Sequence, residues 1–203
     1  MITLVSGATL FPRSETVGHL IVPRAGNAPQ SLNLQPWRWA MDNGAFSGFD
    51  PVAFERMLHR FRGETGCVFV TCPDVVGDAV ATIELWREWS PVIRRYGYRP
   101  AWVAQDGVTN ALIPRCDVVF VGGSTEFKES RQVHNLCAYA KARGVWVHWG
   151  RVNSKRRFRL AMEAGADSVD GSGFSMYPDT RIPMLEKWTA QIKQTPRLNF
   201  QSA

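Results

Sequence analysis

The strongest constraint on the fold is a pattern that recurs eight times: a short apolar segment, a polar or glycine-rich turn, then a helix or a loop. The apolar segments are rich in β-branched and aromatic residues, which favour strands. They begin near Ile2, His19, Trp37, Cys67, Ala101, Asp117, Val145 and Ala166. Strands that alternate with helices form a parallel sheet, and eight units predict a closed (β/α)8, TIM-like barrel of the α/β class. An open, doubly wound sheet is the alternative architecture.

The length of the chain limits how complete such a barrel can be. Its 203 residues lie near the lower end of the range for this fold, which is roughly 200 to 400 residues. We therefore expect one compact barrel domain over residues 1–203, in which the outer helices after the first two strands are reduced to loops. No low-complexity linker divides the chain.

Helix boundaries follow from capping residues and apolar periodicity. Helices are expected over residues 51–62, 79–96, 130–143, 155–164 and 182–193. Asp50 and Pro51 suit the N-cap and first position of the first of these. Pro91 should break or kink the second. Asn153 or Ser154 can cap the fourth, and Gly165 suits the position just beyond its end.

Composition indicates a cytoplasmic setting without a metal or redox cofactor. No apolar run approaches the roughly 20 residues of a membrane-spanning helix, and the N-terminal sequence does not resemble a signal peptide. Four cysteines, Cys67, Cys72, Cys116 and Cys137, lack the paired spacing of a zinc site. We expect free, mostly buried thiols.

The formal net charge of +6 is concentrated in one short segment. Arg151, Lys155, Arg156, Arg157 and Arg159 supply five positive charges there without an acid between them. Cations are disfavoured at a helix start unless an anion docks, because the helix dipole is already positive at that end. The segment therefore predicts a polyanionic partner, without distinguishing DNA, RNA or a nucleotide. A solvated basic helix start is the alternative.

Polar residues gather where the strands of the expected barrel end. They are Asp42, Asp74, Asp78, Gln105, Asp106, Gly122, Gly123, His148 and Asp170. In a βα barrel this end carries the active site, because the βα loops converge there. A single such aspartate can be a turn former or a helix cap, and Asp170 before a glycine-rich loop has that alternative.

These residue types suit chemistry at a glycosidic carbon. Two carboxylates, one attacking and one transferring protons, can exchange or hydrolyse a glycosidic bond. Gln105 offers both a donor and an acceptor to the edge of a base, and the Gly122–Gly123 pair allows a flat ligand to approach the backbone. Trp149, Phe174 and Tyr177 are candidates to stack on that ligand, although core packing is the more common use of aromatic residues.

Five motifs together resemble the tRNA-guanine transglycosylase superfamily. They are MDNGAF (41–46), CPDVVGD (72–78), AQDG (104–107), VGGS (121–124) and GADSVDGSGFS (165–175). Their order and spacing are most similar to the compact branch, of the phage and bacterial DNA-modification type, that inserts 7-deazaguanine bases into DNA. Each motif alone is weak, but the series covers most of the chain. The resemblance implies a βα barrel.

The resemblance also assigns roles to individual residues. Asp170 matches the nucleophile of the family, and Asp42 matches its general acid/base. Asp74, Gln105 and the backbone of Gly122 and Gly123 match the positions that hold the exchanged base. Placement on the same rim adds Asp78 and His148 to the substrate-binding set, and Arg151, Asn153, Lys155, Arg156 and Arg157 to the nucleic-acid-binding set.

Two absences favour DNA over tRNA as the partner. The tRNA enzymes carry a cysteine-rich zinc subdomain and an added RNA-binding domain, and nothing in this sequence resembles either. The expected activity is replacement of guanine in DNA by a 7-deazaguanine, such as the 7-cyano form. Two other functions fit the same features: a barrel enzyme for a small phosphorylated metabolite, and a non-catalytic DNA-binding barrel.

Overall fold

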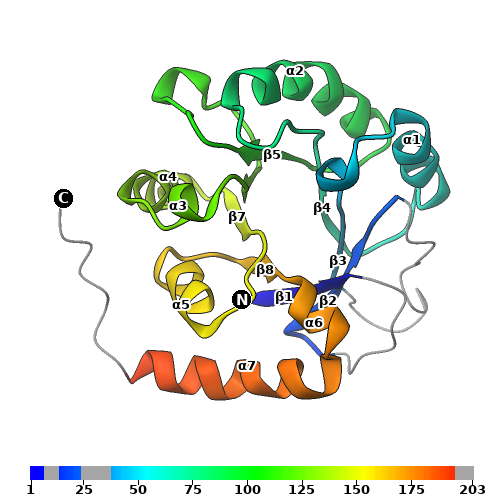
Figure 1. The fold of residues 1–203 in the computed structure, drawn as a ribbon. Coiled ribbons are helices and arrows are strands. Elements are labelled where there is room, and N and C mark those ends of the chain that lie inside the picture. Colours follow the sequence, from blue (N-terminus) through cyan, green and yellow to red (C-terminus); the bar gives the residue numbers. More distant parts are fainter. Residues whose placement is uncertain (7–13, 24–37, 195–203) are drawn as a thin grey trace.

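Eight parallel strands close into a barrel. The computed structural model describes residues 1–6, 14–23 and 38–194. The strands are β1 (Ile2–Ser6), β2 (Val17–Ile21), β3 (Trp39–Met41), β4 (Cys67–Thr71), β5 (Pro100–Ala104), β6 (Val118–Val121), β7 (Trp146–Trp149) and β8 (Ser168–Asp170). Each pairs with its neighbours in chain order, and β8 returns to pair with β1 (Figure 1). The predicted (β/α)8 barrel is confirmed, and the doubly wound alternative is wrong.

Side chains alternate between the inside of the barrel and the layer under the helices. The interior cluster contains Leu4, Leu20, Ala40, Phe69 and Val118, all buried. Intervening strand residues belong to a second, larger cluster between the strands and the helices. This period of two is what a strand requires when both of its faces are covered.

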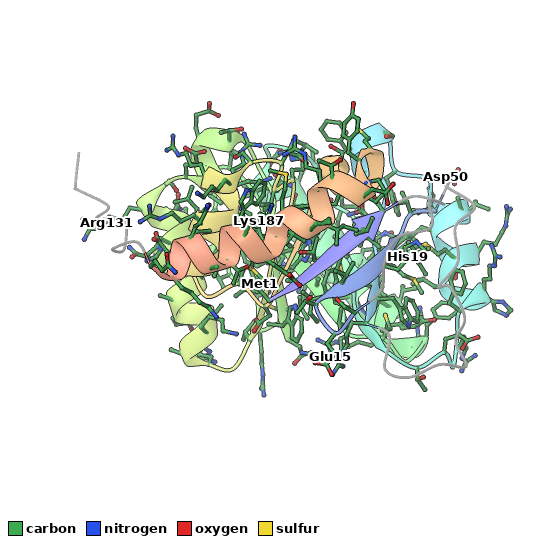
Figure 2. All side chains as sticks on the ribbon, turned by 90° about the horizontal axis from the view of Figure 1, so that it is seen from below. Met1, Glu15, His19, Asp50, Arg131 and Lys187 are labelled. Atoms are coloured by element: carbon green, nitrogen blue, oxygen red, sulfur yellow. The ribbon has the colours of Figure 1, made fainter. Side chains whose placement is uncertain are left out.

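The helices surround the barrel in Figure 1. They are α1 (Pro51–Arg60), α2 (Ala79–Arg95), α3 (Thr125–Lys128), α4 (Arg131–Ala142), α5 (Lys155–Glu163), α6 (Ser172–Met176) and α7 (Pro178–Lys193), with 3-10 turns η1 (Ala45–Ser47) and η2 (Asn110–Leu112). The cap predicted at Asp50 is confirmed, since its carboxylate accepts a hydrogen bond from the Ala53 amide at 3.0 Å. Helix α7 runs along one side, outside α5 and α6, and Figure 2 looks onto it, with Lys187 on its surface.

Of the break or kink expected at Pro91, the break is wrong, because α2 continues through this residue to Arg95. A proline inside a helix costs about 3 kcal/mol, chiefly through one lost hydrogen bond and a clash with the preceding turn. Buried Trp86, Trp89 and Ile93 lie on both sides of Pro91, and their packing against the barrel compensates for that cost.

Two further differences concern the end of the chain. The glycine-rich stretch after Asp170 was expected to be a loop, but residues Ser172–Met176 form α6. Helix α7 begins at Pro178, not at Ile182, because a proline suits the first helical turn. The loops expected after the first two strands fall on 7–13 and 24–37, which lie outside the described residues.

Between β5 and β6 the structure has only the short turn η2. The missing helix leaves a groove of about 1160 Å³ on the outer wall, lined by residues such as Ile113, Val119, Leu136 and Tyr139. This groove contains none of the acidic residues of the barrel rim. All four cysteines are free, as predicted. None of the described helices combines the length and apolar character needed to cross a bilayer.

Candidate active site at the carboxyl end of the barrel

Three aspartates from distant parts of the chain meet at the carboxyl end of the strands. Asp42 follows β3, Asp74 follows β4, and Asp170 is the last residue of β8. They are close enough for the charges of Asp170 and Asp74 both to raise the pKa of Asp42. Like charges gathered in one partly buried site are unfavourable without a function or a compensating partner.

Asp170 is held in its ionised form. Its Oδ2 lies 2.8 Å from Nε2 of His148, and its Oδ1 accepts a hydrogen bond from the Arg151 backbone amide at 3.0 Å. Burial alone would raise the pKa of Asp170, but the His148 contact, the Arg151 amide and the Lys128 charge lower it on balance. A carboxylate that remains ionised while 15% exposed can act as a nucleophile.

His148 contacts Asp170 from inside the barrel. The imidazole is fully buried inside the barrel, with ring centroids of Phe69 and Phe120 at 4.9 and 4.5 Å. Its Nδ1 lies 2.9 Å from the Ser168 hydroxyl. Nε2 donates to ionised Asp170, and the Ser168 hydroxyl at Nδ1 fixes the orientation of the ring. The sequence placed His148 in the substrate-binding set, whereas this geometry makes it an orienting partner of Asp170.

The pKa of Asp42 is raised, whereas that of Asp170 is lowered. Burial, followed by the charges of Asp170 and Asp74, raises its pKa to about 7, despite hydrogen bonds from the Asn43 and Gly44 backbone amides. The Asn43 amide lies 2.8 Å from Oδ1. A carboxyl with a pKa near 7 can both give and take a proton at neutral pH, which is the property of a general acid/base.

Asp74 is oriented by two buried amides. Asn43 Nδ2 donates to its Oδ1, and Gln105 Nε2 donates to its Oδ2, both at 2.6 Å. The other end of Gln105 accepts from the Gly77 amide at 3.0 Å. Burial raises the pKa of Asp74, although these two hydrogen bonds oppose the shift. Gln105 thus orients Asp74 here, while the further lone pairs of Asp74 remain available to a donor edge.

The Gly122–Gly123 pair is constrained by packing. A Cβ atom on Gly122 would come within 2.7 Å of Val103 and 2.9 Å of Gln105 Nε2. One on Gly123, where φ is +74°, would come within 2.6 Å of Asp106 Oδ2. Asp106 itself accepts from the amide and hydroxyl of Ser124 at 2.7 and 2.5 Å. Both glycines therefore keep the β5 and β6 ends close together.

The basic segment divides into two groups. Arg151 donates to the Gly123 carbonyl, and Arg157 donates to the Thr125 hydroxyl at 2.8 Å, so both guanidinium groups lie beside the β6 loop. Lys155 instead donates to Gln191 of α7, and Arg156 forms an ion pair with Glu129 at 2.6 Å.

The remaining sequence candidates have structural contacts. Asn153 accepts from the Gly173 amide and so ties the β7 loop to α6. Asp78 caps α2 through the amides of Val80 and Ala81, both at 2.9 Å. Trp149 and Phe174, the proposed stacking residues, are each 2% exposed and pack in the core, while Tyr177 is exposed.

Three residues of the site were not singled out from the sequence. Asn43 orients Asp74, and only its place beside Asp42 in the motif could have indicated it. Phe46 is 76% exposed, and the Arg151 guanidinium lies 5.5 Å from its ring. Lys128 is 4% exposed and donates to the Gly150 carbonyl at 2.9 Å. Burial, followed by repulsion from Arg151, lowers the Lys128 pKa to about 7.

No cluster of three or more His, Cys, Asp or Glu side chains suited to a metal ion occurs in 1–6, 14–23 or 38–194. The fold and site thus define a (β/α)8 barrel whose acid–base groups gather at the carboxyl end of the strands, where barrel enzymes carry their active sites.

Comparison with known proteins does not narrow this class. No protein-family model matches the chain, and no curated protein matches its sequence. The Bacillus subtilis YkuI protein, which has an EAL domain and was solved with c-di-GMP and calcium, is 14% identical with a TM-score of 0.49, over 80% of this chain and 45% of that one. A Klebsiella pneumoniae BlrP1 complex with manganese and cyclic diGMP is 14% identical with a TM-score of 0.43, over 69% and 39%. The chain spans less than half of either protein, and likenesses this weak say nothing about its chemistry.

Proposed function

We propose that the chain is an enzyme, a base-exchange transglycosylase that replaces guanine in DNA with a 7-deazaguanine such as 7-cyano-7-deazaguanine. The observation that carries the proposal is the contrast between Asp42, whose pKa is raised to about 7, and Asp170, whose pKa is lowered. Neighbouring carboxyls whose pKa values are driven apart are suited to be proton donor and nucleophile, respectively. The choice of guanine and its deaza analogue as the bases rests on the resemblance of the sequence motifs to the tRNA-guanine transglycosylase superfamily.

In the first half of the reaction, the Asp170 carboxylate attacks C1′ of the target nucleotide. The bond between C1′ and N9 of guanine breaks, its electron pair goes to the base, and protonated Asp42 supplies the proton that the leaving base needs. The sugar is then esterified to Asp170, and Asp42 is ionised. Burial is the largest cause of the raised Asp42 pKa, but the repulsion from Asp170 is lost once the ester neutralises that residue, which makes ionised Asp42 less unfavourable at this stage.

In the second half, the incoming 7-deazaguanine loses a proton from N9 to Asp42. The N9 nitrogen attacks C1′, the ester bond to Asp170 breaks, and both carboxyls return to their starting states. Atoms and charges balance without a metal or a redox cofactor.

Recognition of the base would fall to Asp74. The Watson–Crick edge of guanine presents the N1 proton and an amino group, both donors, which suit a carboxylate. Asn43 and Gln105 fix the plane of that carboxylate and leave it further lone pairs. The exposed Phe46 ring is available to stack on the base or its neighbour.

A guanine inside a duplex cannot place C1′ against a carboxylate at the mouth of a barrel, so the nucleotide must leave the stack. Arg151 and Arg157, at the same rim, would hold flanking phosphates. Lys155 and Arg156 lie at the start of the same helix, α5, where they contact Gln191 and Glu129.

The test is to incubate the protein with guanine-containing DNA and 7-cyano-7-deazaguanine, digest the DNA, and identify nucleosides by mass spectrometry. We expect the deazaguanine nucleoside with the native protein and none with Asp170→Asn, which keeps the size of the side chain. A folded protein that binds DNA but forms no modified nucleoside would contradict the proposal.

The same samples separate the two rival functions. A metabolite enzyme would bind small organic phosphates and show little affinity for DNA. A non-catalytic DNA-binding barrel would bind DNA in a salt-dependent way and be indifferent to Asp42→Asn and Asp170→Asn.

A further inference from the structure

Lys128 is a buried lysine that the proposed chemistry does not use. It is the last residue of α3, the short helix that follows β6, and its side chain is 4% exposed. Among the residues that the structure describes, no carboxylate forms an ion pair with it at 4.0 Å or less. Burying an ammonium group without a carboxylate partner is costly, so its position requires a reason.

The partner of Lys128 is a single peptide group. Its Nζ donates to the Gly150 carbonyl at 2.9 Å, and the amide of the same peptide, that of Arg151, donates to Asp170 Oδ1 at 3.0 Å. The Gly150–Arg151 peptide therefore lies between the Lys128 amine on its oxygen side and the candidate nucleophile on its nitrogen side. A hydrogen bond donated to the carbonyl polarises the amide and strengthens its N–H as a donor, most strongly when the donor is charged.

The conformation of this peptide is constrained from three directions. A Cβ atom on Gly150 would come within 2.7 Å of the Phe120 ring, so only glycine fits there. Arg151 has a φ of +59°, the only positive value among the described non-glycine residues. Such a conformation is unfavourable for an arginine and persists where its surroundings enforce it. The next amide, that of Val152, donates to the Asp170 backbone carbonyl at 2.6 Å.

We propose that Lys128 is a positioning residue, which holds the Gly150–Arg151 peptide so that its amide orients Asp170. Its kinetic consequence rests on the proposed function, in which Asp170 is the nucleophile, whereas its structural consequence does not. Charged groups of four elements act on Lys128: Arg151 after β7 and Arg157 of α5 oppose its charge, while Asp170 of β8 and Asp106 after β5 favour it.

The variant that tests the inference is Lys128→Met, which keeps most of the side-chain length and removes the donor and the charge. Lys141→Met is the matched control, because Lys141 pairs with Asp167 at 2.7 Å, at the opposite end of β8 from Asp170. Both variants are first checked for cooperative unfolding. The structural readout is amide hydrogen exchange of Arg151 by NMR, together with the titration of the Asp170 carboxyl carbon.

In Lys128→Met we expect Arg151 to exchange at least about tenfold faster than in the native protein, since its peptide loses one of its two anchors. The Asp170 pKa should rise, and Lys141→Met should change neither quantity. In base exchange, kcat should fall about tenfold or more while KM stays within about threefold, as expected when orientation of a nucleophile is lost.

The outcomes separate the two proposals. If the native protein exchanges no base but Lys128→Met still releases the Arg151 amide and raises the Asp170 pKa, the positioning role stands and the transglycosylase proposal fails. If the native protein is active and Lys128→Met matches it in Arg151 exchange, Asp170 titration and kcat, the positioning role is wrong. Should Lys128→Met not fold, the native protein decides: an Arg151 amide that exchanges as fast as an unstructured one overturns the inference, and a protected amide supports it.

Discussion

Asp42, directly after β3, and Asp170, the last residue of β8, lie on the same rim of the barrel, yet they favour opposite protonation states. The raised pKa of Asp42 depends in part on Asp170, whose charge is its second largest cause after burial. Asp170 can remain ionised because His148, the Arg151 amide and Lys128 favour its charge. Only two backbone amides, those of Asn43 and Gly44, favour the charge of Asp42, so Asp42 is the member of the pair that takes the proton. This asymmetry favours different protonation states of the two carboxyls before any substrate binds.

The first prediction concerns the pH dependence of guanine release in a single turnover without an incoming base. In the proposed mechanism this step needs Asp42 protonated and Asp170 ionised. The rate should therefore be greatest in mildly acidic solution and should fall about tenfold per pH unit above about pH 7, as Asp42 loses its proton. On the acid side it should fall only once Asp170 is protonated, which requires a pH below the usual range for aspartate.

The Asp42→Asn variant is the control for that profile. It should release guanine slowly and without the alkaline decline, because the group that titrates is gone. A native profile that stays flat across neutral pH would mean that Asp42 is not the acid.

The second prediction concerns stability. The Asp42 pKa is higher in the folded protein than in the unfolded chain, so between pH 3.8 and about 7 the folded state holds a proton that the unfolded state has lost. The free energy of unfolding contributed by Asp42 therefore decreases as the pH rises through this window, and the loss is complete above it. Asp42→Asn should be more stable than the native protein by up to a few kcal/mol at alkaline pH, with little difference at low pH.

Urea unfolding of both proteins across this pH range measures the difference directly. Asp117→Asn is a suitable comparison, since Asp117 is half-exposed and pairs with Arg94 at 3.0 Å outside the rim. A stability gain for Asp42→Asn that is the same at all pH values would contradict the raised pKa.

Much of this barrel was predictable because it depends on local patterns. Apolar runs bounded by turn residues locate the strands, and the parallel topology then brings the strand ends to one rim. The gathering of Asp42, Asp74 and Asp170 needs no more than that rule. Caps such as Asp50 are equally local, since side chain and amide lie three residues apart.

The rest depends on tertiary packing. Lys128 ends a short polar helix and resembles a surface residue in the sequence; only the position of the β7 loop over it makes it buried. The course of α2 through Pro91 depends on a barrel surface that local propensity does not include. Gln105 was expected to read a base, and its engagement with Asp74 and Gly77 involves residues about thirty positions away.

The third prediction tests the support of Asp74. In Gly122→Ala the new methyl group would overlap Val103 and the Gln105 amide, and Gln105 must shift away from Asp74. We expect a destabilisation of about 1–3 kcal/mol and a rise in KM for the incoming base that exceeds any change in kcat. Gly97→Ala is the control: φ there is +90° and no atom lies within 4 Å, so it should lose stability through backbone strain but keep its KM. Equal KM values in the two variants would show that Gln105 does not contribute to binding of the incoming base.

The fourth prediction distinguishes the cations at the start of α5. Arg157 lies beside the rim with hydroxyl and carbonyl partners, whereas Arg156 is neutralised by Glu129. Arg157→Ala should weaken binding to guanine-containing DNA severalfold, equally for all sequences, and reduce the slope of log affinity against log salt by about 1. Arg156→Ala should change that slope less, because its charge is already paired.

Arg87→Ala, which removes an exposed ion pair with Glu84 on α2, provides the baseline. Fluorescence anisotropy at several salt concentrations measures all three, and a larger effect for Arg156 than for Arg157 would place the DNA on the outer side of α5 and away from Asp170.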